Sequence, residues 1–334
     1  MNEIAVVWVA LGTPAQPTPP AVRQYLRQFL TDRRIIEMNP IAWRAILELF
    51  ILPKRGVASA EKYAGIWTPD GSPLLVHTKN QAQGIAERLE GVTVTYAMRY
   101  GEPNLGSVLD RLAAEGVSKV LIVPAYPQYS QTTVGSIYDA VARHILASRN
   151  QLEYRFIRSV PTHPGYIDAL ATTIERRWVT TGRPDFAAGE TLLLSYHSIP
   201  VAMVDAGDPY VTECQATTTA LAARLGLDEQ QCRTTYQSKF GPAAWLTPAT
   251  IDTVAELARS DIRRLDIACP GFVADCLETL EELDLLNQET YLSTLPESAH
   301  PTALFNRVPC LNDDPLFLDA LTNIIRTGIV GWLP

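Results

Sequence analysis

Residues 119–130 have the sequence KVLIVPAYPQYS, and residues 264–275 have the sequence RLDIACPGFVAD. In each stretch a short apolar run ends at a proline, and polar or small residues follow. Short apolar runs of this kind are typical of strands that are buried on both faces of a parallel sheet. A helical pattern precedes each run, and before it stands a similar tripeptide, Arg99-Tyr-Gly or Lys239-Phe-Gly. The two halves of the chain therefore contain a weak internal repeat.

Apolar runs alternate with amphipathic helical patterns along most of the remaining sequence. Such alternation predicts βαβ units and parallel sheets covered by helices. The expected strands are 4–11, 92–98, 119–124, 152–157, 191–196, 233–237 and 265–269. The expected helices are 21–29, 78–89, 105–115, 134–147, 164–178, 210–225, 247–258, 275–286 and 314–327. The fold class is therefore α/β, with two flavodoxin-like (Rossmann-type) domains and a cleft between them.

The expected domains are residues 1–150, residues 151–310, and a C-terminal helical segment, 311–334, that packs back on the first domain. We expect the boundary near 147–150. In open parallel sheets, ligands bind beyond the carboxyl ends of the strands. Those ends are therefore where catalytic or binding residues are expected.

Composition narrows the class of protein. The 334 residues are 47% apolar and 19% charged, which is ordinary for a globular chain and argues against disorder. A net charge of −8 argues against a nucleic-acid partner, because phosphate binding needs a basic face. The five cysteines are scattered without a C-x-x-C pair, so no disulfide framework is expected. No apolar run is long enough to span a bilayer, and the apolar N-terminus is interpreted as a buried strand. A cytoplasmic protein is expected.

Several familiar sites are missing from the sequence. It contains no G-x-x-x-x-G-K-[ST] loop, no G-x-G-x-x-G after the first expected strand, and no G-x-S-x-G elbow. Nucleotide binding and serine hydrolase chemistry therefore lose their main support.

His197 follows the expected strand 191–196, where a side chain can face the cleft. Imidazole titrates near neutral pH, so it can accept a proton or bind a borderline metal ion. A histidine that only hydrogen-bonds within a turn is the alternative.

A second group of polar residues follows the strand that ends at Cys269. Asp275, Glu278 and Glu282 are spaced i, i+3, i+7, which places three carboxylates on one face of an α-helix. Oxygen ligands together with an imidazole suit a hydrated ferrous ion. The alternative is a capping box, Asp-x-x-Glu, at a helix start.

The segment from Tyr126 to Ser136, YPQYSQTTVGS, occupies the equivalent position in the first half. Tyrosines, hydroxyls and a glycine at a strand-to-helix turn can line a flat aromatic ligand or hold its carboxylates. A plain polar turn is the alternative.

With these motifs in place, the chain resembles the ferrochelatases, from Leu11 to about Leu311. The order and number of the matching segments make the resemblance specific, and their wording is closest to the gram-negative bacterial, protoporphyrin-type members. The segments are LGTP (11–14), YAGIWTPDGSPL (63–74), MRYG (98–101), YPQYS (126–130), SYHSIP (195–200), GDPY (207–210), QSKFG (237–241), Trp245-Leu246 and CPGFVADCLETLEEL (269–283).

The resemblance implies an enzyme that inserts Fe²⁺ into protoporphyrin IX to give protohaem, the last step of haem biosynthesis, in a chelatase-like porphyrin cleft. It implies that His197 and Glu278 are catalytic and bind the iron, and that Asp275 and Glu282 extend an acidic path from Glu278. Whether His197 acts chiefly as base or as ligand, and from which face iron enters, stay open. The residues that it places in the porphyrin pocket are Tyr63, Ser72, Arg99, Tyr126, Ser136 and Trp245.

Alternatives within the class are a coproporphyrin III ferrochelatase or another porphyrin metal chelatase, and outside it a non-catalytic porphyrin or haem carrier. No permanently bound cofactor is expected, with Fe²⁺ as a substrate. An iron–sulfur cluster is not expected, because Gln131 stands where cluster-bearing relatives can have a cysteine and the cysteine-rich tail is absent. A monomer or weak homodimer is expected.

Residues 41–53, IAWRAILELFILP, suggest a peripheral contact with a membrane. Trp43, Ile46, Leu47 and Phe50 are spaced i, i+3, i+4, i+7, and basic residues stand on both sides of the segment. An apolar lip that touches the bilayer and admits a porphyrin is one interpretation. An ordinary core helix is the other.

Overall fold

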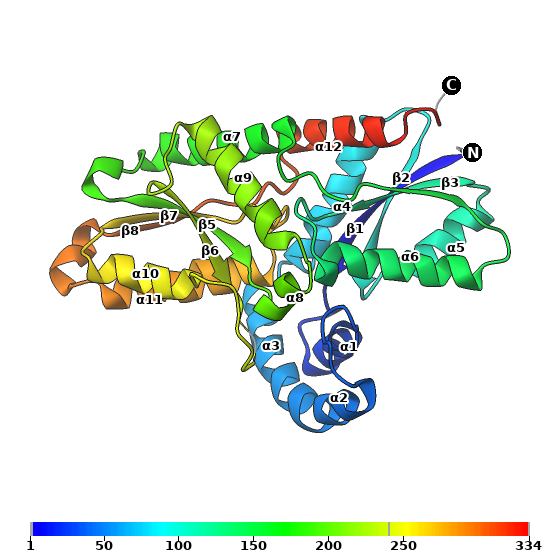
Figure 1. Ribbon diagram of the computed structural model, residues 1–334, viewed down its shortest axis with the longest axis horizontal. Coiled ribbons are helices and arrows are strands. Elements are labelled where there is room, and N and C mark those ends of the chain that lie inside the picture. The colour runs from blue at the N-terminus through cyan, green and yellow to red at the C-terminus, as the bar shows by residue number, and fades with distance from the viewer. Residues whose placement is uncertain (1–2, 240, 333–334) are drawn as a thin grey trace. The chain divides into compact units, whose positions relative to one another are not determined.

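The computed structural model describes residues 3–239 and 241–332. Two four-stranded sheets organise them, with strand orders β2-β1-β3-β4 and β6-β5-β7-β8, and every neighbouring pair is parallel (Figure 1). The second order repeats the first, strand for strand. This confirms the predicted parallel α/β class and gives the sequence repeat a structural basis.

Chain contacts divide the protein into two compact units. The first runs to Ser159 and resumes at Leu318, and the second comprises Val160–Phe317. The elements of the first unit are β1 (Ile4–Gly12), α1 (Pro19–Leu30), α2 (Pro40–Ile46), η1 (Leu47–Ile51), α3 (Leu52–Ile66), α4 (Pro73–Ala86), β2 (Thr93–Tyr100), α5 (Leu105–Ala114), β3 (Lys119–Pro124), η2 (Gln131–Gly135), α6 (Ser136–Ala147), β4 (Glu153–Phe156) and most of α12 (Pro315–Gly328). Those of the second are α7 (Pro164–Thr181), η3 (Phe186–Ala188), β5 (Thr191–His197), α8 (Val201–Asp205), α9 (Tyr210–Leu225), β6 (Cys232–Gln237), α10 (Thr250–Arg259), β7 (Arg264–Ala268), η4 (Glu278–Asn287), α11 (Gln288–Thr294), η5 (Glu297–Thr302) and β8 (Leu304–Arg307).

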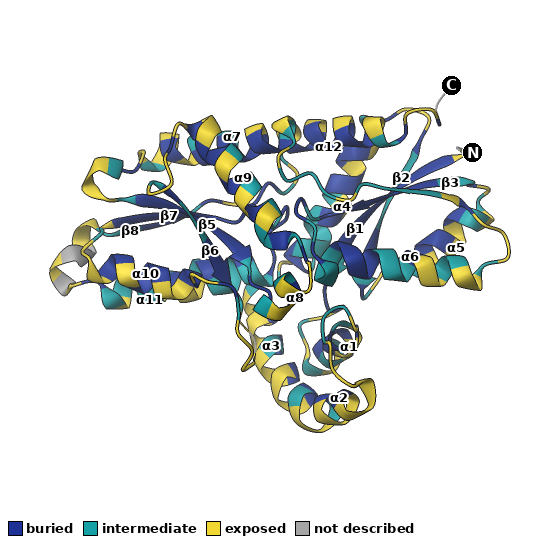
Figure 2. Cartoon of the chain, in the orientation of Figure 1, coloured by how far each residue is buried: buried dark blue, intermediate teal, exposed yellow. Residues whose placement is uncertain are grey.

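The strands form the buried layer of each unit, and the helices present an exposed outer face (Figure 2). In the first unit Val7 of β1 and Ile122 of β3 pack with Leu109 of α5 and Val141 of α6, all of them fully buried. Each such side chain contributes about 1.5–3 kcal/mol through burial. Helices cover the sheet, so its strands do not need a polar face toward water. This explains why the strands are continuous apolar runs in the sequence.

The first unit extends beyond the expected boundary near 147–150. Strand β4 comes after that point, yet it pairs with β3 and completes the first sheet. The C-terminal helix α12 also contributes to this unit: Arg88, which follows α4, pairs with Asp319 at 2.8 Å, and Arg326 donates to the Arg88 carbonyl. Strand β8 was not expected from the sequence, because its four residues, LFNR, form no apolar run.

Three segments of the described chain are π-helical, and this differs from the expected α-helices. They are η1, η2 and η4, in the segment 41–53, after Tyr126 and after Asp275 respectively. A π-helix bonds each residue to the one five positions away, so residues four or five apart share a face. The i, i+3, i+7 argument for three aligned carboxylates is therefore wrong, since Asp275 precedes the helix and the helix is not an α-helix.

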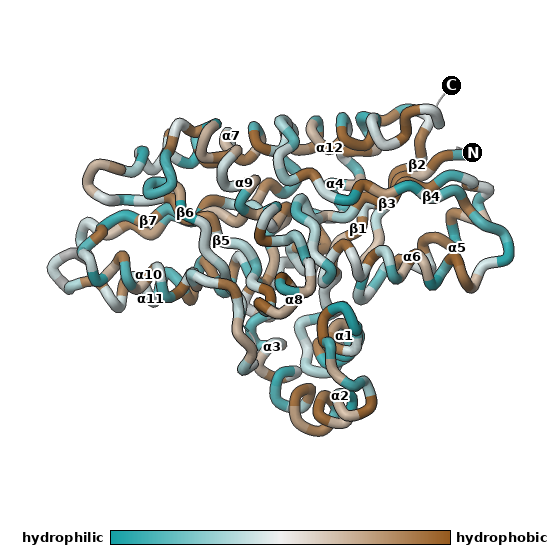
Figure 3. The backbone as a smooth tube through the Cα atoms, in the orientation of Figure 1, coloured by the Kyte–Doolittle hydropathy of each residue, from teal (hydrophilic) through white to brown (hydrophobic). Residues whose placement is uncertain are grey.

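The apolar stripe of 41–53 is also divided. Trp43 and Leu47 are buried, and the Trp43 indole donates to the Leu30 carbonyl at 2.6 Å. Ile41, Leu49 and Phe50 are instead exposed, at 83%, 67% and 66%. This stretch is hydrophobic in Figure 3 and largely exposed in Figure 2. The segment thus has both an inward core face and an outward apolar face, rather than one stripe.

Within the described ranges, no helix combines the length and apolar character that crossing a membrane requires.

Candidate active site

His197 is the last residue of β5, as the sequence placed it, and its ring is half-buried. Its Nδ1 lies 2.6 Å from the Ser198 carbonyl oxygen. Because a carbonyl oxygen only accepts, the hydrogen must be on Nδ1. The neutral ring therefore keeps its lone pair on Nε2, the atom that can take a proton or bind a metal ion.

Glu278 and Glu282 lie four residues apart in η4, a spacing that brings side chains to one side of a π-helix. Glu282 Oε1 accepts from the Ser238 amide at 2.8 Å, and its Oε2 accepts from the Ser238 hydroxyl at 2.5 Å. Ser238 directly follows β6 and has a φ of 66°. Its two hydrogen bonds therefore hold the Glu282 carboxylate at the end of that strand.

The charges of His197 and Glu278 both act on Glu282. Burial raises the pKa of the Glu282 carboxyl, and the negative charge of Glu278 adds to this effect. The Ser238 hydrogen bonds oppose it, as does the charge that His197 carries when it is protonated, and the pKa of Glu282 remains above its usual value. The structure therefore brings an imidazole and two carboxylates into mutual influence at the carboxyl end of the second sheet.

Gln237, the last residue of β6, connects these parts. It pairs with His197 in the sheet register and is 3% exposed. Its Nε2 donates to the Glu278 backbone carbonyl at 3.0 Å, and its Oε1 accepts from the Ser195 hydroxyl at 2.7 Å. One side chain thus links β5, β6 and the start of η4.

Asp275 makes a different set of contacts from those expected. Its Oδ1 pairs with Arg307 at 2.8 Å, and its Oδ2 accepts from Asn312 at 2.9 Å. Burial raises the pKa of this carboxyl, but the Arg307 charge and the hydrogen bonds outweigh burial and hold the pKa below its usual value. Asp275 is therefore held by an ion pair and a hydrogen bond within the fold, and its part in an acidic path stays a prediction.

The capping-box alternative is not formed either. A capping box needs the Glu278 carboxylate to accept from the Asp275 amide. That amide instead donates to Asn312 Oδ1 at 2.8 Å. Glu278 therefore makes no capping-box contact with the Asp275 amide.

Five of the expected porphyrin-pocket residues belong to the first unit. Arg99 and Ser136 bond to each other through Arg99 Nε and Ser136 Oγ at 2.7 Å, and both bond to the buried Asp32 carboxylate. Ser72 accepts from the Thr13 hydroxyl at 2.8 Å.

The two tyrosines of the set lie among hydrophobic neighbours. Tyr63 is buried against the rings of Tyr25 and Trp67. Tyr126 is partly buried and packs against the core of the first unit. In the second unit, Trp245 pairs with Pro200 beside the segment that follows His197. Its indole nitrogen is buried and has no hydrogen-bond partner within the described ranges.

Sequence reasoning missed three residues of these networks. Gln237 and Ser238 stand in the QSKFG motif, whose position at a strand end was the available signal. Asp32 carried no such signal, because a single aspartate after a helix is ordinary. Among the residues that the structure describes, no group of three or more His, Cys, Asp or Glu side chains is arranged to hold a metal ion.

The fold resembles that of solved chelatases. SirB from Bacillus subtilis with Fe³⁺ matches 98% of this chain and 96% of its own, with 10% identity and a TM-score of 0.56. The sirohydrochlorin chelatase SirB from Bacillus subtilis subspecies spizizenii, in complex with cobalt, matches 99% and 97%, with 9% identity and a TM-score of 0.55. A multi-domain protein from Deinococcus radiodurans with structural similarity to chelatases matches 98% of this chain and 55% of its own, with 12% identity and a TM-score of 0.51. The fold is thus that of the chelatase class.

The family model for ferrochelatase matches residues 3–329. The chain belongs to the ferrochelatase family. It is accordingly a metal-insertion enzyme that acts on a tetrapyrrole.

Proposed function

We propose that the chain inserts Fe²⁺ into protoporphyrin IX to give protohaem, with His197 and Glu278 as the catalytic residues and Glu282 in support. The observation that supports this proposal is the hydrogen bond between His197 Nδ1 and the Ser198 carbonyl, which leaves Nε2 available, together with the influence of His197 and Glu278 on the Glu282 carboxyl. Membership of the family indicates the class of reaction. The side chains of the site indicate which groups take up protons and bind the metal ion.

Metallation exchanges two pyrrole N–H protons for one divalent cation. His197 Nε2 can accept one proton, which is the usual contribution of a general base. Glu278 offers a carboxylate oxygen to the incoming cation, and Glu282, whose pKa is raised, can take up the second proton. Carboxylate and imidazole together suit Fe²⁺, which exchanges its water for these ligands in steps.

The porphyrin is proposed to contact Tyr63, Ser72, Arg99, Tyr126, Ser136 and Trp245. Arg99 is the one cation of this set and is suited to a propionate carboxylate. Its Nε and Nη2 atoms already bond to Ser136 and Asp32, which hold the guanidinium in place. The buried Trp245 indole, which lacks an acceptor among the described residues, is a further donor for the ligand.

The test of the site compares His197→Ala and Glu278→Gln with the wild type. Both variants should fold and bind porphyrin, while turnover falls by about two to four powers of ten, the scale of a lost acid–base group. Glu278→Gln is the sharper variant, because it keeps the size of the side chain and removes its charge. Near wild-type iron insertion by Glu278→Gln would refute the assignment.

The substrate is tested by offering Fe²⁺ and Co²⁺ in turn with protoporphyrin IX, coproporphyrin III and sirohydrochlorin. The proposal requires the highest kcat/KM for Fe²⁺ with protoporphyrin IX. A preference for coproporphyrin III or sirohydrochlorin would keep the enzyme class and change its substrate. Binding without turnover of any pair would instead indicate a carrier.

We propose that no iron–sulfur cluster is bound. All five cysteines are buried, and burial raises the pKa of each thiol, which disfavours the thiolate that a cluster needs. Visible absorption with stoichiometric sulfide in an anaerobic preparation would contradict this.

We further propose that the outward face of 41–53 contacts a membrane surface, which delivers an apolar porphyrin. Ile41, Leu49 and Phe50 are exposed there, and the basic Arg33, Lys54 and Arg55 stand near them in sequence. Apolar side chains rimmed by cations are typical of interfacial segments.

Phe50→Asp should lower co-sedimentation with anionic vesicles several-fold and leave the fold intact, because Phe50 is exposed. Leu146→Asp is the matched control, since Leu146 is 87% exposed and lies on α6, outside this segment. Equal vesicle binding by the wild type and Phe50→Asp would refute the membrane contact.

A further inference from the structure

The Gln237 side chain bridges two parts of the proposed catalytic site that otherwise come from different elements. His197 ends β5, whereas Glu278 begins η4 after β7. Gln237 lies beside His197 in the β5–β6 register, and its amide reaches the Glu278 carbonyl at 3.0 Å. It is therefore the direct link between the strand end that carries the imidazole and the helix that carries the carboxylate.

The orientation of this amide is fixed by its partners. A backbone carbonyl only accepts, so the NH₂ group must face Glu278. The Ser195 hydroxyl then donates to Oε1 at 2.7 Å, and Ser195 lies 2.7 Å from the Thr250 hydroxyl. The Gln237 backbone adds a third link, because its carbonyl accepts from the Ser198 amide at 2.8 Å. With 3% exposure, Gln237 has no freedom to turn toward solvent.

The start of η4 is restrained locally by Thr279, whose hydroxyl accepts from the Cys276 amide at 2.9 Å, and from β6 by Gln237. Its N-cap, Leu277, supplies no side-chain hydrogen bond. The Gln237 amide therefore holds the backbone of the residue whose carboxylate is proposed to receive the metal ion. Misplacement of a catalytic group by about 1 Å can cost about a hundredfold in rate, so a restraint of this kind has kinetic consequences.

We infer that Gln237 is a positioning residue, which sets the separation between the His197 imidazole and the Glu278 carboxylate. This inference rests on the proposed function. Gln237 itself touches neither reacting nitrogen nor metal ion, and it acts through the Glu278 backbone and through the β5 end.

The test is Gln237→Met, which keeps an unbranched side chain of similar size and removes both hydrogen-bonding groups. Metal-insertion kcat/KM for the metal ion should fall about 10- to 100-fold, the usual effect of losing a residue that orients a metal ligand. The dissociation constant for porphyrin, measured by fluorescence quenching, should change less than about twofold. Gln237→Asn, which can reach one partner at a time, should lie between Gln237→Met and the wild type.

Thr235→Val is the matched control. Thr235 lies two residues earlier on the same face of β6 and is fully buried, and its hydroxyl accepts from Thr250 of α10 rather than bonding to η4. Its activity should stay within about threefold of the wild type. An equal loss in Thr235→Val, or a wild-type kcat/KM in Gln237→Met, would overturn the inference in favour of general packing.

A double variant separates this inference from the proposed function. If Gln237 acts through Glu278, then adding Gln237→Met to Glu278→Gln should cause less than about a twofold further loss, since coupled residues are not additive. A full additional 10- to 100-fold loss would show an independent role and overturn the inference. Should Glu278→Gln alone keep its activity, the proposed site fails, whatever Gln237 does.

Discussion

At the scale of single residues, Glu282 has an environment that costs stability. Its carboxyl is half-buried near Glu278, and both burial and the neighbouring charge raise its pKa above the usual 4.5. A carboxyl whose pKa is raised on folding stabilises the fold fully only below its unfolded pKa. That contribution is lost as the pH rises through the pKa that Glu282 has in the folded protein. At neutral pH Glu282 therefore destabilises the second unit.

Glu282→Gln should accordingly stabilise the protein by about 0.5–2 kcal/mol at pH 7–8, the usual range for relieving one unfavourable site. A glutamine can keep both Ser238 contacts, because the serine hydroxyl can turn to accept. The gain should disappear below about pH 4.5, and metal insertion should be slower at every pH. Thermal unfolding followed across this pH range measures the effect, and a destabilised variant at pH 8 would contradict it.

A second residue shows how a short motif reports backbone geometry. Gly12 of the LGTP motif has a φ of 111°, and a Cβ there would lie 1.7 Å from the Tyr100 carbonyl oxygen of β2. Only glycine permits this approach, and no catalytic role is needed to explain it. Not every residue of a family motif is therefore a site residue.

At the scale of elements, the π-helices η1, η2 and η4 lie in or directly after three of the segments that the sequence singled out, namely 41–53, Tyr126–Ser136 and the stretch from Asp275. The π-helix is rare, accounting for well under 1% of residues, and it occurs often at functional sites. Two of them, η2 and η4, follow β3 and β7, which occupy the same position in the two repeated sheets. The duplication thus includes the irregular helix starts as well as the strands.

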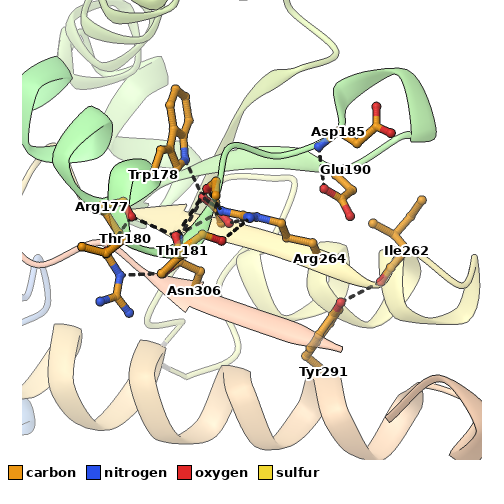
Figure 4. Close-up of polar contacts among 12 residues, drawn as sticks. Arg177, Trp178, Thr180, Thr181, Asp185, Glu190, Ile262, Arg264, Tyr291 and Asn306 are labelled. Carbon is orange, nitrogen blue, oxygen red and sulfur yellow. Dashed lines mark hydrogen bonds and ion pairs between the residues drawn. The ribbon is translucent and has the colours of Figure 1, made fainter. Parts of the chain in front are cut away.

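The opposite end of the second sheet contains a different kind of network (Figure 4). Asp266 of β7 is fully buried and accepts from Arg264, Trp178 and Asn306, with Trp178 Nε1 at 2.6 Å. Arg264 also donates to the carbonyl oxygens of Thr181 and Gly182, where α7 ends. This network joins the C-terminus of α7 to the amino end of β7, whereas the proposed site lies at the carboxyl end of β5 and in η4.

Asp266→Asn should therefore destabilise the fold by about 3–5 kcal/mol, because it leaves the buried Arg264 without a counter-charge. Asp261→Asn is the control: Asp261 pairs with Arg263 on the surface, where side-chain exposures are 51% and 47%. That change should cost at most about 1 kcal/mol. Urea unfolding measures both, and the folded fraction of Asp266→Asn should retain its kcat. A stability equal to the wild type would show that this pair is not needed.

At the scale of the whole molecule, the chain leaves the first unit and returns to it. Helix α12 supplies Ile325, which is fully buried, and Gly328 lies against Leu121 of β3, where a Cβ would approach within 3.0 Å. Arg155 of β4 donates to the Val330 carbonyl at 2.7 Å. The core of the first unit is therefore completed by residues of α12, which are far from β1 and β3 in the sequence.

Ile325→Ala should destabilise the first unit by about 2–5 kcal/mol, the usual cost of a large-to-small change in a core. Leu316→Ala, at a position 41% exposed on the same helix, should change stability by less than about 1 kcal/mol. Hydrogen exchange should quicken in β1, β3 and α4 of Ile325→Ala before it quickens in β5 and β7. Uniform quickening over both units would contradict a local role for α12.

Much of this architecture was fixed by local pattern. The bounds of β3 and α9 agree with the expectation residue for residue or nearly so, because apolar runs and 3.6-residue periodicity are properties of the segment itself. The position of His197 at a strand end follows from the same pattern. Parallel pairing and the repeat also follow, since strands separated by helices leave few other arrangements.

What only the tertiary structure decided is which side chains meet. Asp275 looked like a third site carboxylate, yet Arg307, 32 residues later, takes it into an ion pair. Gln237 was expected only as a strand residue, and the structure shows that its side chain also contacts Glu278, 41 residues away. The same holds for β4 and α12, whose membership in the first unit depends on partners distant in sequence. Periodicity reports how one segment is buried, whereas the choice of partner depends on the packing of several segments at once, and no local pattern encodes that choice.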